Sequence, residues 1–395
     1  MITKRPRIAF ITSFDPDGRH SWSGTSRSMA RALEKNLGEI TFLGPVRHDL
    51  SLLRLANRMV KKLTGKAYNI SHSILASKKY ASIVDKRLQE DHYDIIISPA
   101  SGPVLSELKT SLPVVYFTDT TFKSLYNYYE WFSGFTAFSV WEGNRTEKKA
   151  LRNSDVVVVA SQWAYNSVLQ DYGIDPEKIF IAPMGANIDH VPPLEKTGKR
   201  ERGDACRLLF IGMEWKRKGG DIAVETLERL RSMGLNTELT VCGCELPDEY
   251  MHLGIRNIPF IDKRKPEDLE LFYSLLENHH FLLLPTRAEC FGIVFCEASA
   301  FGMPSITTDT GGIASAVENG VNGYRLPWKA GGEKYAQKIA DIYTSYEHKY
   351  LPLSRSSRIK FDETLNWDSW SAVIKNILMD KGILNACFSG AGGDR

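Results

Sequence analysis

Two glutamates stand close together in the stretch RAECFGIVFCEASAFGMP, residues 287–304, and their type and spacing could do chemistry. Glu289 lies beside a Cys-Phe-Gly turn, and Glu297 lies inside an otherwise apolar run. Burial of a carboxylate among apolar side chains is costly unless something pairs with it. A carboxylate that accepts hydrogen bonds from two vicinal hydroxyls is the usual way to hold a ribose. We therefore expect Glu297 to bind a ribose and Glu289 a second polyol. The alternative is that Glu289 is solvated and that Glu297 pairs with a basic side chain.

The turn between the two glutamates has the features of an anion site. The run HFLLLP (280–285) is typical of a strand, and the helix-like segment IVFCEASAF (293–301) follows the turn. A helix that begins just after a strand directs free N–H groups and a positive dipole end at the turn, which suits a phosphate. Gly292 permits close approach of backbone and ligand. Glu297 lies about one and a half helical turns further on and can reach the same ligand.

A second stretch, FIGMEWKRKGGDIAVETLERL (210–230), runs from a strand through Gly212 and a short loop to Lys218, and then into a helix. Basic residues beside a helix N-terminus neutralise the charge of a diphosphate. The alternative is an ordinary surface turn with solvated lysines.

A third stretch, SFDPDGRHSWSGTSRSMARALE (13–34), has a long loop that reaches a helix at Gly24 and Thr25. This turn could approach a phosphate or a sugar. The same loop contains Asp15 and Asp17, which are two carboxylates that could hold a metal ion. Because Asp-Pro-Asp-Gly is more simply a turn, we predict no metal site.

The elements that must position these residues alternate between short β-branched runs and amphipathic helical segments. The predicted strands are 7–13, 40–44, 93–98, 112–118, 155–161 and 178–183, followed by 206–212, 237–243, 257–262, 280–285, 304–309 and 322–327. This alternation favours doubly wound, mostly parallel sheets of the α/β class. The polar, charge-dense segment between 190 and 206 is typical of a linker, so we expect two Rossmann-like halves with a cleft between them.

The composition agrees with an ordinary two-domain globular protein. The chain has 395 residues, of which 43% are hydrophobic and 25% are charged, with 50 Lys and Arg against 47 Asp and Glu. This balance argues against nucleic acid as a bulk partner. The N-terminus does not resemble a targeting signal, and the most apolar run, 281–285, is far shorter than the roughly 20 residues of a membrane span. The six cysteines form no CxxC pair, so we expect reduced thiols in a cytoplasmic protein without a zinc site.

Residues 50–63, LSLLRLANRMVKKL, form an amphipathic pattern with apolar residues on one face and basic residues opposite. Between 47 and 87 there are ten Lys or Arg against two Asp, a local charge of +8. A basic amphipathic helix can dock on an anionic membrane surface. The alternative is that its apolar face packs on the core of the first domain. The aromatic stretch 126–141 could likewise line a sugar path or pack in the core.

At this point the motifs resemble a known family. ECFGIVFCE, with its glutamates eight positions apart, and the following TDTGGI (308–313) resemble the EX7E signature of retaining glycosyltransferases of family 4, which have the GT-B fold. The order of the other motifs also matches: WSGTSRSMARAL, IAPMGANID (181–189), LLFIG…KRKGGDIAVETL and VENGVNGYRLP (317–327). The resemblance covers most of residues 205–330 and the N-terminal half more loosely.

The resemblance implies a role for each motif residue. Glu297 would hold the ribose of a nucleotide-sugar donor, and Glu289 would contact the donor sugar near its reacting carbon. The diphosphate would be bound by Lys218 and a nearby arginine. The backbone that would line the donor belongs to Cys290, Phe291, Gly292 and Ile293. From the opposite domain, Gly24 and Thr25 would close over the phosphates. Members of the family retain the anomeric configuration and need no bound metal or other cofactor.

Two departures from the family pattern concern charged residues. The family usually has Gly-Arg after the first strand of the nucleotide domain, whereas here Gly212 is followed by Met213. We expect Arg217 to be the substitute. Where the family often has a histidine, this chain has Asp119, which could orient a hydroxyl or accept the acceptor's proton. The alternative is that Asp119 caps the following helix.

The resemblance therefore implies a retaining, metal-independent hexosyltransferase. It would move a sugar from a nucleotide sugar to a hydroxyl of a glycan or lipid-linked glycan, in bacterial polysaccharide or glycolipid synthesis. A sugar-nucleotide epimerase or phosphorylase on the same fold and a non-catalytic glycan-binding scaffold are the alternatives. We expect an acceptor domain at 1–190, a linker at 191–205, a nucleotide-sugar domain at 206–364, and a C-terminal helix at 365–387 that crosses back to the first domain. The protein would be cytoplasmic, or peripheral at the inner face of the cell membrane.

Overall fold

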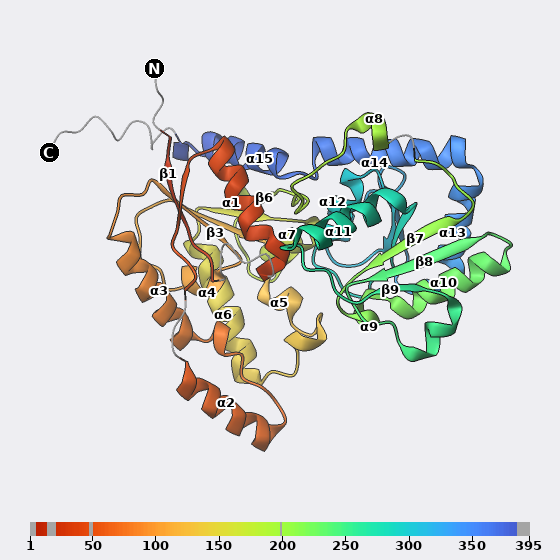
Figure 1. Cartoon of the computed structure of the whole chain (residues 1–395). Helices are drawn as coiled ribbons and strands as arrows, with labels where there is room; N and C mark the ends of the chain where they lie inside the picture. The colour runs from red at the N-terminus through yellow and green to blue at the C-terminus, as the bar shows by residue number, and fades with distance from the viewer. Residues whose placement is uncertain (1–4, 14–20, 47–49, 198–199, 385–395) are drawn as a thin grey trace. The chain divides into compact units, whose positions relative to one another are not determined.

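The computed structural model describes residues 5–13, 21–46, 50–197 and 200–384, which group into two compact units (Figure 1). Unit 1 comprises residues 1–182 and 370–395, and unit 2 comprises residues 183–369. The segment 191–205, which the sequence suggests as a linker, belongs to unit 2, where helix α8 (Leu194–Thr197) packs against helix α14 (Leu351–Glu363).

The described part of unit 1 contains one six-stranded parallel sheet with the order β2-β1-β3-β4-β5-β6. Its strands are β1 (Arg7–Phe10), β2 (Glu39–Phe42), β3 (Ile95–Pro99), β4 (Val114–Thr118), β5 (Val156–Val159) and β6 (Ile179–Ile181). All residues of β3, β4 and β5 are buried, as expected for strands covered on both faces. The chain first moves from β1 to β2 and then crosses to the other side of β1, so the topological switch point lies between β1 and β3.

Helices cover both faces of this sheet (Figure 1). Apart from α2 (Ser51–Thr64), which does not cover the sheet, the helices of this part of the chain are α1 (Thr25–Asn36), α3 (Ile74–Leu88), α4 (Gly102–Leu105), α5 (Phe122–Leu125), α6 (Ala137–Asn153) and α7 (Gln162–Gln170). The predicted C-terminal helix is observed as α15 (Trp367–Asp380), and from Trp370 onward it belongs to unit 1. There the buried Trp370 packs edge-on against Phe117 with ring centroids 5.4 Å apart, and Asn36 donates a hydrogen bond to Ser371.

Unit 2 repeats the same design. Its parallel sheet has the order β12-β11-β10-β7-β8-β9, which places the switch point between β7 and β10. The strands are β7 (Cys206–Ile211), β8 (Thr237–Cys242), β9 (Arg256–Ile258), β10 (Phe281–Leu284), β11 (Ser305–Thr308) and β12 (Gly323–Leu326). The longer helices are α10 (Gly220–Ser232), α11 (Pro266–Asn278), α12 (Ile293–Ala300), α13 (Gly332–Thr344) and α14, and a short helix α9 (Trp215–Lys218) precedes α10. Each predicted strand in either unit is therefore confirmed.

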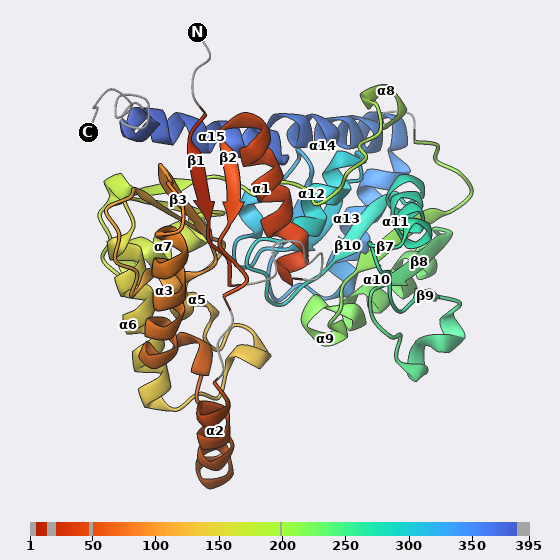
Figure 2. The ribbon, with the colours of Figure 1, turned by 60° about the vertical axis from the view of Figure 1, so that its left-hand side comes forward.

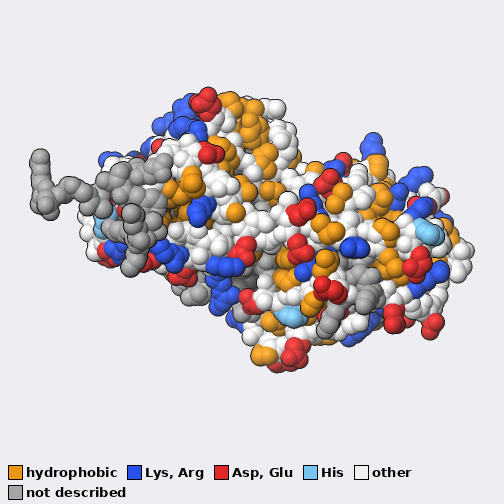
Figure 3. Space-filling view, turned by 90° about the horizontal axis from the view of Figure 1, so that it is seen from above, with side chains coloured by type: hydrophobic (Ala, Val, Ile, Leu, Met, Phe, Trp, Pro, Cys, Tyr) orange, Lys and Arg blue, Asp and Glu red, His pale blue; other side chains and the backbone are white. Residues whose placement is uncertain are grey.

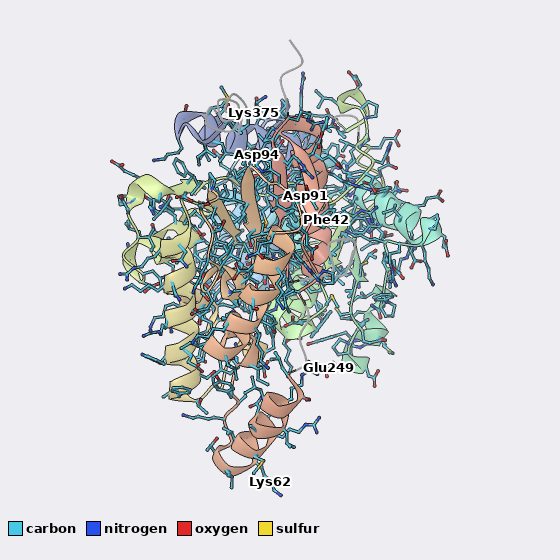
Figure 4. All side chains as sticks on the ribbon, turned by 90° about the vertical axis from the view of Figure 1, so that its left-hand side faces the viewer. Phe42, Lys62, Asp91, Asp94, Glu249 and Lys375 are labelled. Atoms are coloured by element: carbon cyan, nitrogen blue, oxygen red, sulfur yellow. The ribbon has the colours of Figure 1, made fainter. Side chains whose placement is uncertain are left out.

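Helix α2 differs from the other long helices of unit 1 because its apolar side chains are exposed. Leu55, Met59 and Leu63 have exposed fractions of 56%, 60% and 82%. Figures 2 and 4 show α2 extending away from the rest of unit 1, with Lys62 on it far from Asp91 and Asp94. The alternative that the apolar face of this helix packs on the core is therefore wrong. No helix in the described part of the chain is long and apolar enough to cross a membrane.

Candidate functional site

The candidate residues of unit 2 lie on loops that leave the carboxyl ends of β7 and β10, on either side of the switch point. The loop after β7 contains Gly212 and Lys218, and the loop after β10 contains Glu289 and Gly292. Parallel α/β sheets bind ligands in the crevice at this position, because the loops of neighbouring strands diverge there. The sheet order thus brings together the motifs that the sequence placed about 70 residues apart.

Glycines fix the path of the loop after β7. Gly219 ends α9 and begins α10 with φ of 79°, and a Cβ at this position would lie 2.1 Å from the carbonyl oxygen of Pro285. Only glycine fits such a contact in a left-handed conformation. At Gly212 a Cβ would lie 2.6 Å from Cγ of Lys218, so the lysine stem lies directly against the backbone at the end of β7.

Backbone hydrogen bonds then connect the two loops. The carbonyl oxygen of Arg217 accepts hydrogen bonds from the backbone N–H of Arg287 at 2.7 Å and from Oγ1 of Thr286 at 3.2 Å. In return, Nη1 of Arg217 donates to the carbonyl oxygen of Ala288 at 2.8 Å. These bonds hold the basic end of α9 beside the turn that carries Glu289.

Glu289 is buried, with an exposed fraction of 8%, and its Oε2 accepts a hydrogen bond from Nζ of Lys218. Nη1 of Arg217 lies 3.9 Å from the same oxygen. The alternative that Glu289 is solvated is therefore wrong, because its neighbour on α9 provides the charge that burial requires. Glu289 and Lys218, which the sequence predicts as separate site residues, therefore form an ion pair with each other.

The main partner of Arg217 is Glu214. Nε and Nη2 of Arg217 donate to the two carboxylate oxygens of Glu214 at 2.8 and 3.1 Å, and this hydrogen bonding lowers the pKa of Glu214. The paired geometry is the strong, bidentate form of an arginine–carboxylate contact. Arg217 thus stands next to Lys218, with part of its guanidinium already engaged.

The turn after Glu289 has the close backbone approach that the sequence predicts. Gly292 has φ of 91°, and a Cβ there would lie 2.5 Å from the ring of Phe295 and 3.2 Å from Cγ of Glu289. Cys290 and Phe291 are buried, whereas Ile293, the first residue of α12, is partly exposed. No side chain caps the N-terminus of α12, so its first N–H groups are oriented as for anion binding.

Glu297 is buried inside α12, with an exposed fraction of 4%, and its partner is Lys263. Nζ of Lys263 lies 2.8 Å from Oε1 of Glu297 and 3.7 Å from the ring centroid of Phe272. The alternative that Glu297 pairs with a basic side chain is therefore confirmed for the ligand-free protein. Sequence reasoning missed Lys263. A signal was available, because a buried carboxylate at a strand-end loop needs a cation, and Lys263 lies in the loop after β9.

Three further candidates, Gly24, Thr25 and Asp119, lie in unit 1. Gly24 has φ of 80° and precedes α1, whose first residue is the buried Thr25. Asp119 follows β4, and its Oδ2 accepts a hydrogen bond from Nε1 of Trp22 at 3.4 Å. The interpretation of Asp119 as a helix cap is wrong, because the side chain of Thr121 caps α5 by accepting from the N–H of Ser124. Asp15 and Asp17 lie outside the described residues.

Among the described residues, no group of three or more His, Cys, Asp or Glu could hold a metal ion. Five of the six cysteines are described, and all five are buried thiols outside any disulfide. Burial raises the pKa of the Cys296 thiol, which lies next to Glu297 in α12, well above its ordinary value. The sixth, Cys387, lies outside the described part of the chain.

Comparison with known families agrees with the motifs. A model described as "Glycosyl transferases group 1" matches residues 205–345, and a model described as "Glycosyltransferase Family 4" matches residues 25–190. The chain belongs to the group 1 glycosyltransferases of family 4. The two matched segments include the loops of unit 2 and the candidates Thr25 and Asp119 of unit 1.

Two curated relatives illustrate the similarity. The chain is 28% identical over 253 residues to the D-inositol 3-phosphate glycosyltransferase of Corynebacterium glutamicum, a match that spans 59% of each protein. It is 27% identical over 199 residues to a glycogen synthase of Mycobacterium tuberculosis, spanning 49% of this chain and 46% of that protein. The chain thus spans less than two thirds of the length of these relatives.

Solved structures share the fold over nearly the whole chain. The lipopolysaccharide outer core galactosyltransferase WaaB in its apo form has a TM-score of 0.62 at 16% identity, covering 95% of this chain and 99% of its own. The sucrose-phosphate synthase of Thermosynechococcus elongatus has a TM-score of 0.65 at 17% identity, covering 97% and 100%. The two parallel six-stranded sheets with their helices are therefore those of the GT-B fold.

Proposed function

We propose that this chain is a retaining hexosyltransferase that moves a sugar from a nucleotide-sugar donor to a hydroxyl of a glycan or lipid-linked glycan acceptor. The observation that carries this proposal is the buried Lys218–Glu289 ion pair at the switch point of unit 2, beside the N-terminus of α12. These groups match the parts of a sugar diphosphate. The cation and the oriented N–H groups can bind its phosphates, and the carboxylate can accept hydrogen bonds from its sugar hydroxyls. The D-inositol 3-phosphate glycosyltransferase and glycogen synthase relatives support the same reaction class.

Each group then has a role in donor binding. The N–H groups at Gly292 and Ile293 and the positive end of α12 bind a diphosphate oxygen. Lys218 has three N–H donors, so it can retain Glu289 and still contact the diphosphate. Glu297 accepts from the ribose hydroxyls, in place of or together with Lys263. Glu289 faces the donor sugar, and Cys290 and Phe291 form the floor beneath it.

The same groups stabilise the departure of the nucleotide. Negative charge grows on the diphosphate as the bond to the sugar breaks, and Lys218, Arg217 and the α12 dipole oppose it at fixed positions. These groups provide the electrostatic role that a metal ion has in other transferases, so we propose transfer without a metal or other cofactor. On unit 1, Gly24 and Thr25 contribute N–H groups for the phosphates, and Asp119 orients or deprotonates the acceptor hydroxyl. The acceptor attacks from the face that the nucleotide leaves, which retains the anomeric configuration.

A two-step assay tests the proposal. UDP-, GDP- and ADP-sugars are first screened by thermal shift, because a bound ligand raises the unfolding temperature; UDP is included because the related Anabaena protein HepE was solved with UDP. The best donor is then incubated with and without glycan acceptors, and the anomeric configuration of the product is read by NMR. Retaining transfer that requires the acceptor is expected. Turnover of the donor without acceptor would indicate an epimerase, and binding without any turnover would indicate a scaffold.

We also propose that α2 docks on an anionic membrane surface, which would place the enzyme in the cytoplasm at the inner face of the membrane. The exposed Leu55, Met59 and Leu63 have no cover among the described residues of unit 1. Basic side chains accompany them at Arg54, Arg58, Lys61, Lys62 and Lys66. An apolar stripe with flanking cations matches the acyl and headgroup layers of an anionic bilayer. The acceptor would then be lipid-linked, as in bacterial polysaccharide or glycolipid synthesis.

Vesicle flotation tests this docking. The protein should float with vesicles that contain phosphatidylglycerol, less so at high salt, and not with pure phosphatidylcholine vesicles. The variant Leu55→Ser/Met59→Ser/Leu63→Ser should stay in solution. The control Leu75→Ser changes an exposed leucine of α3 (49% exposed) and should float like the unaltered protein. Equal flotation of all three proteins would overturn the docking proposal and leave the donor chemistry untouched.

A further inference from the structure

Unit 1 contains a surface pocket of about 930 Å³ lined by residues of α5, of α6 and of the segment at the end of α7. Its walls carry five basic side chains and one acidic side chain, which is Asp171. The basic side chains are Lys123, Arg145, Lys148, Lys149 and Arg152. The carboxylate of Asp171 accepts a hydrogen bond from Oγ of Ser167 at 2.6 Å. The pocket lining is therefore basic, with five cations against one carboxylate, which lies just after α7 and is hydrogen-bonded to Ser167.

The positive charge of the pocket arises from the distribution of charged side chains on α6, whose acidic residues are buried and whose basic residues line the pocket. On the face of the molecule in Figure 3, basic and acidic side chains are interspersed. Helix α6 differs from this face, because its acidic side chains are buried whereas its basic side chains line the pocket. Both of its glutamates are buried: Glu147 accepts a hydrogen bond from the Tyr116 hydroxyl of β4, and Glu142 accepts from the Tyr68 hydroxyl and the N–H of Ile74. Four side chains spaced by four, three and four residues lie together on the pocket face: Trp141, Arg145, Lys148 and Arg152. The burial pattern of α6 thus leaves its cations without acidic neighbours on the same helix.

The ion pairs in the described part of the chain do not neutralise this face. Lys149 pairs with Glu107 at 2.9 Å, but none of Arg145, Lys148 and Arg152 forms an ion pair with a described residue. Like charges spaced by three or four residues on a helix repel one another. A helix that keeps such a stripe unneutralised is well suited to an anionic ligand, because binding removes this repulsion.

The floor of the pocket is fixed by buried hydrogen bonds. The hydroxyl of the buried Tyr172 donates to Oδ1 of Asn144 at 2.9 Å and accepts from the N–H of Lys123 at 2.9 Å. These bonds join α5 and α6 to the segment that follows α7, beside the basic side chains. At the rim, the half-exposed Trp141 stacks under Arg145, whose Cζ lies 5.5 Å from the ring centroid, which orients the guanidinium. The cations therefore surround a defined space.

We propose that this pocket binds a diphosphate or other multiply phosphorylated group. Two guanidiniums can each engage a phosphate through paired N–H donors, and the ammonium groups of Lys123 and Lys148 can share the remaining charge. The site lies wholly within unit 1 and uses none of the donor-binding residues of unit 2, so it does not depend on the proposed transferase reaction. The phosphates belong either to a soluble ligand or to a phosphorylated lipid headgroup.

Calorimetry of the full chain with inorganic pyrophosphate tests this site. Nucleotides are left out because their own phosphates would compete for the pocket, and the residues of unit 2 are the same in all proteins compared. The test variant is Lys148→Glu/Arg152→Glu, which reverses two charges of the pocket. The control is Lys78→Glu/Lys86→Glu, which reverses two exposed charges of α3 on the same unit. Pyrophosphate should bind to the unaltered protein and the control alike, and at least about tenfold more weakly to the test variant. Circular dichroism melting identifies a folding defect, in which case Lys148→Gln/Arg152→Gln replaces the test variant.

Equal pyrophosphate affinity in the test variant and the control would overturn the proposal, and so would the absence of pyrophosphate binding to the unaltered protein. A flotation arm with phosphatidylglycerol vesicles distinguishes the source of the phosphates. Weaker flotation of the test variant than of the control, with α2 intact in both, assigns the pocket to a lipid headgroup. Unchanged flotation together with the lost pyrophosphate binding assigns it to a soluble ligand.

Discussion

Nζ of Lys263 lies 2.8 Å from Oε1 of Glu297, and this contact joins the loop after β9 to the interior of α12. Glu297 is nearly fully buried and Lys263 is about one third exposed on its side chain. The lysine thus supplies, in the ligand-free protein, the hydrogen bond that an apolar helix cannot. If a ribose takes over this role, the lysine and the ligand become exchangeable partners of one carboxylate.

Replacing Lys263 by Met should therefore lower the unfolding temperature of the ligand-free protein, because Glu297 loses its partner. The expected cost is about 1–3 kcal/mol, below that of a fully buried pair because Lys263 is partly solvated. The nucleotide that stabilises the unaltered protein most should stabilise Lys263→Met by more, since the ribose hydroxyls restore the lost hydrogen bond. Thermal shift with Lys265→Met as the control measures both effects. An equal nucleotide-induced shift in all three proteins would show that no ribose reaches Glu297.

The Lys218–Glu289 pair predicts the kinetics of two variants. Glu289→Ala and Lys218→Ala should each lower the transfer rate by about 100-fold or more, as for the loss of one electrostatic stabiliser of a transition state. The double variant should lose much less than the product of the two, because the two residues act as one unit. Initial rates with the best donor test this, and Lys216→Ala on the exposed side of α9 is the control. Near-normal turnover in both single variants would contradict the site assignment.

Gly219 and Gly234 have similar backbone conformations but different surroundings, so replacing each by alanine separates the cost of the conformation from the cost of a steric clash. Both have φ near 80°, but a Cβ at Gly219 meets the carbonyl oxygen of Pro285 at 2.1 Å, whereas a Cβ at Gly234 meets nothing within 4 Å. Gly234→Ala should cost about 1 kcal/mol of unfolding free energy from the left-handed conformation alone. Gly219→Ala should cost about 2–4 kcal/mol, because the two loops must also separate. Urea unfolding measures both values, and equal costs would refute the close contact between α9 and β10.

Glu147 predicts a pH dependence of the stability of unit 1. Burial raises its pKa from 4.5 to about 7, and the hydrogen bond from the Tyr116 hydroxyl at 3.1 Å acts in the opposite direction. At a pH between these two values, the carboxyl of Glu147 is therefore protonated in the folded state and ionised in the unfolded state. The stabilising contribution of that proton is complete below pH 4.5 and is lost as the pH rises through about 7.

The variant Glu147→Gln removes this proton, so its unfolding free energy should fall less than that of the unaltered protein between pH 4.5 and 7. Tyr116→Phe should shift the loss of stability to higher pH, since the lowering hydrogen bond is gone. Chemical unfolding at a series of pH values measures both. Parallel pH profiles of Glu147→Gln and the unaltered protein would exclude Glu147 as the titrating group.

Much of the fold could be predicted because it depends on local pattern. Alternating β-branched runs identified every strand, and the position of Gly212, Lys218 and Gly292 after strands followed from that alternation. The pairing of Lys218 with Glu289 could not be read from spacing, because it depends on the order β10-β7 in the sheet. Lys263 was missed for the same reason, since β9 and α12 are brought together only by the tertiary structure.

Other differences arose where two local patterns compete. Asp119 and Thr121 are both good helix caps, and the chain uses Thr121 because α5 begins only at Phe122. The amphipathic pattern of α2 predicted a helix correctly but could not indicate whether its apolar face meets a core or solvent. That choice depends on the surface available beside the helix, which a one-dimensional pattern does not contain.

The carbonyl of Arg217, held by Arg287 and Thr286, has a consequence for the speed of donor capture. These bonds and the Gly219–Pro285 contact are made within the protein and involve none of the atoms that we propose to bind the diphosphate, so they fix both loops independently of that ligand. An arriving nucleotide then loses its own conformational freedom but does not have to order the protein around it. If the proposed donor site is correct, we expect donor association to be limited by diffusional encounter and by release of Glu297 from Lys263, and selectivity among donors to depend on how long each one stays bound.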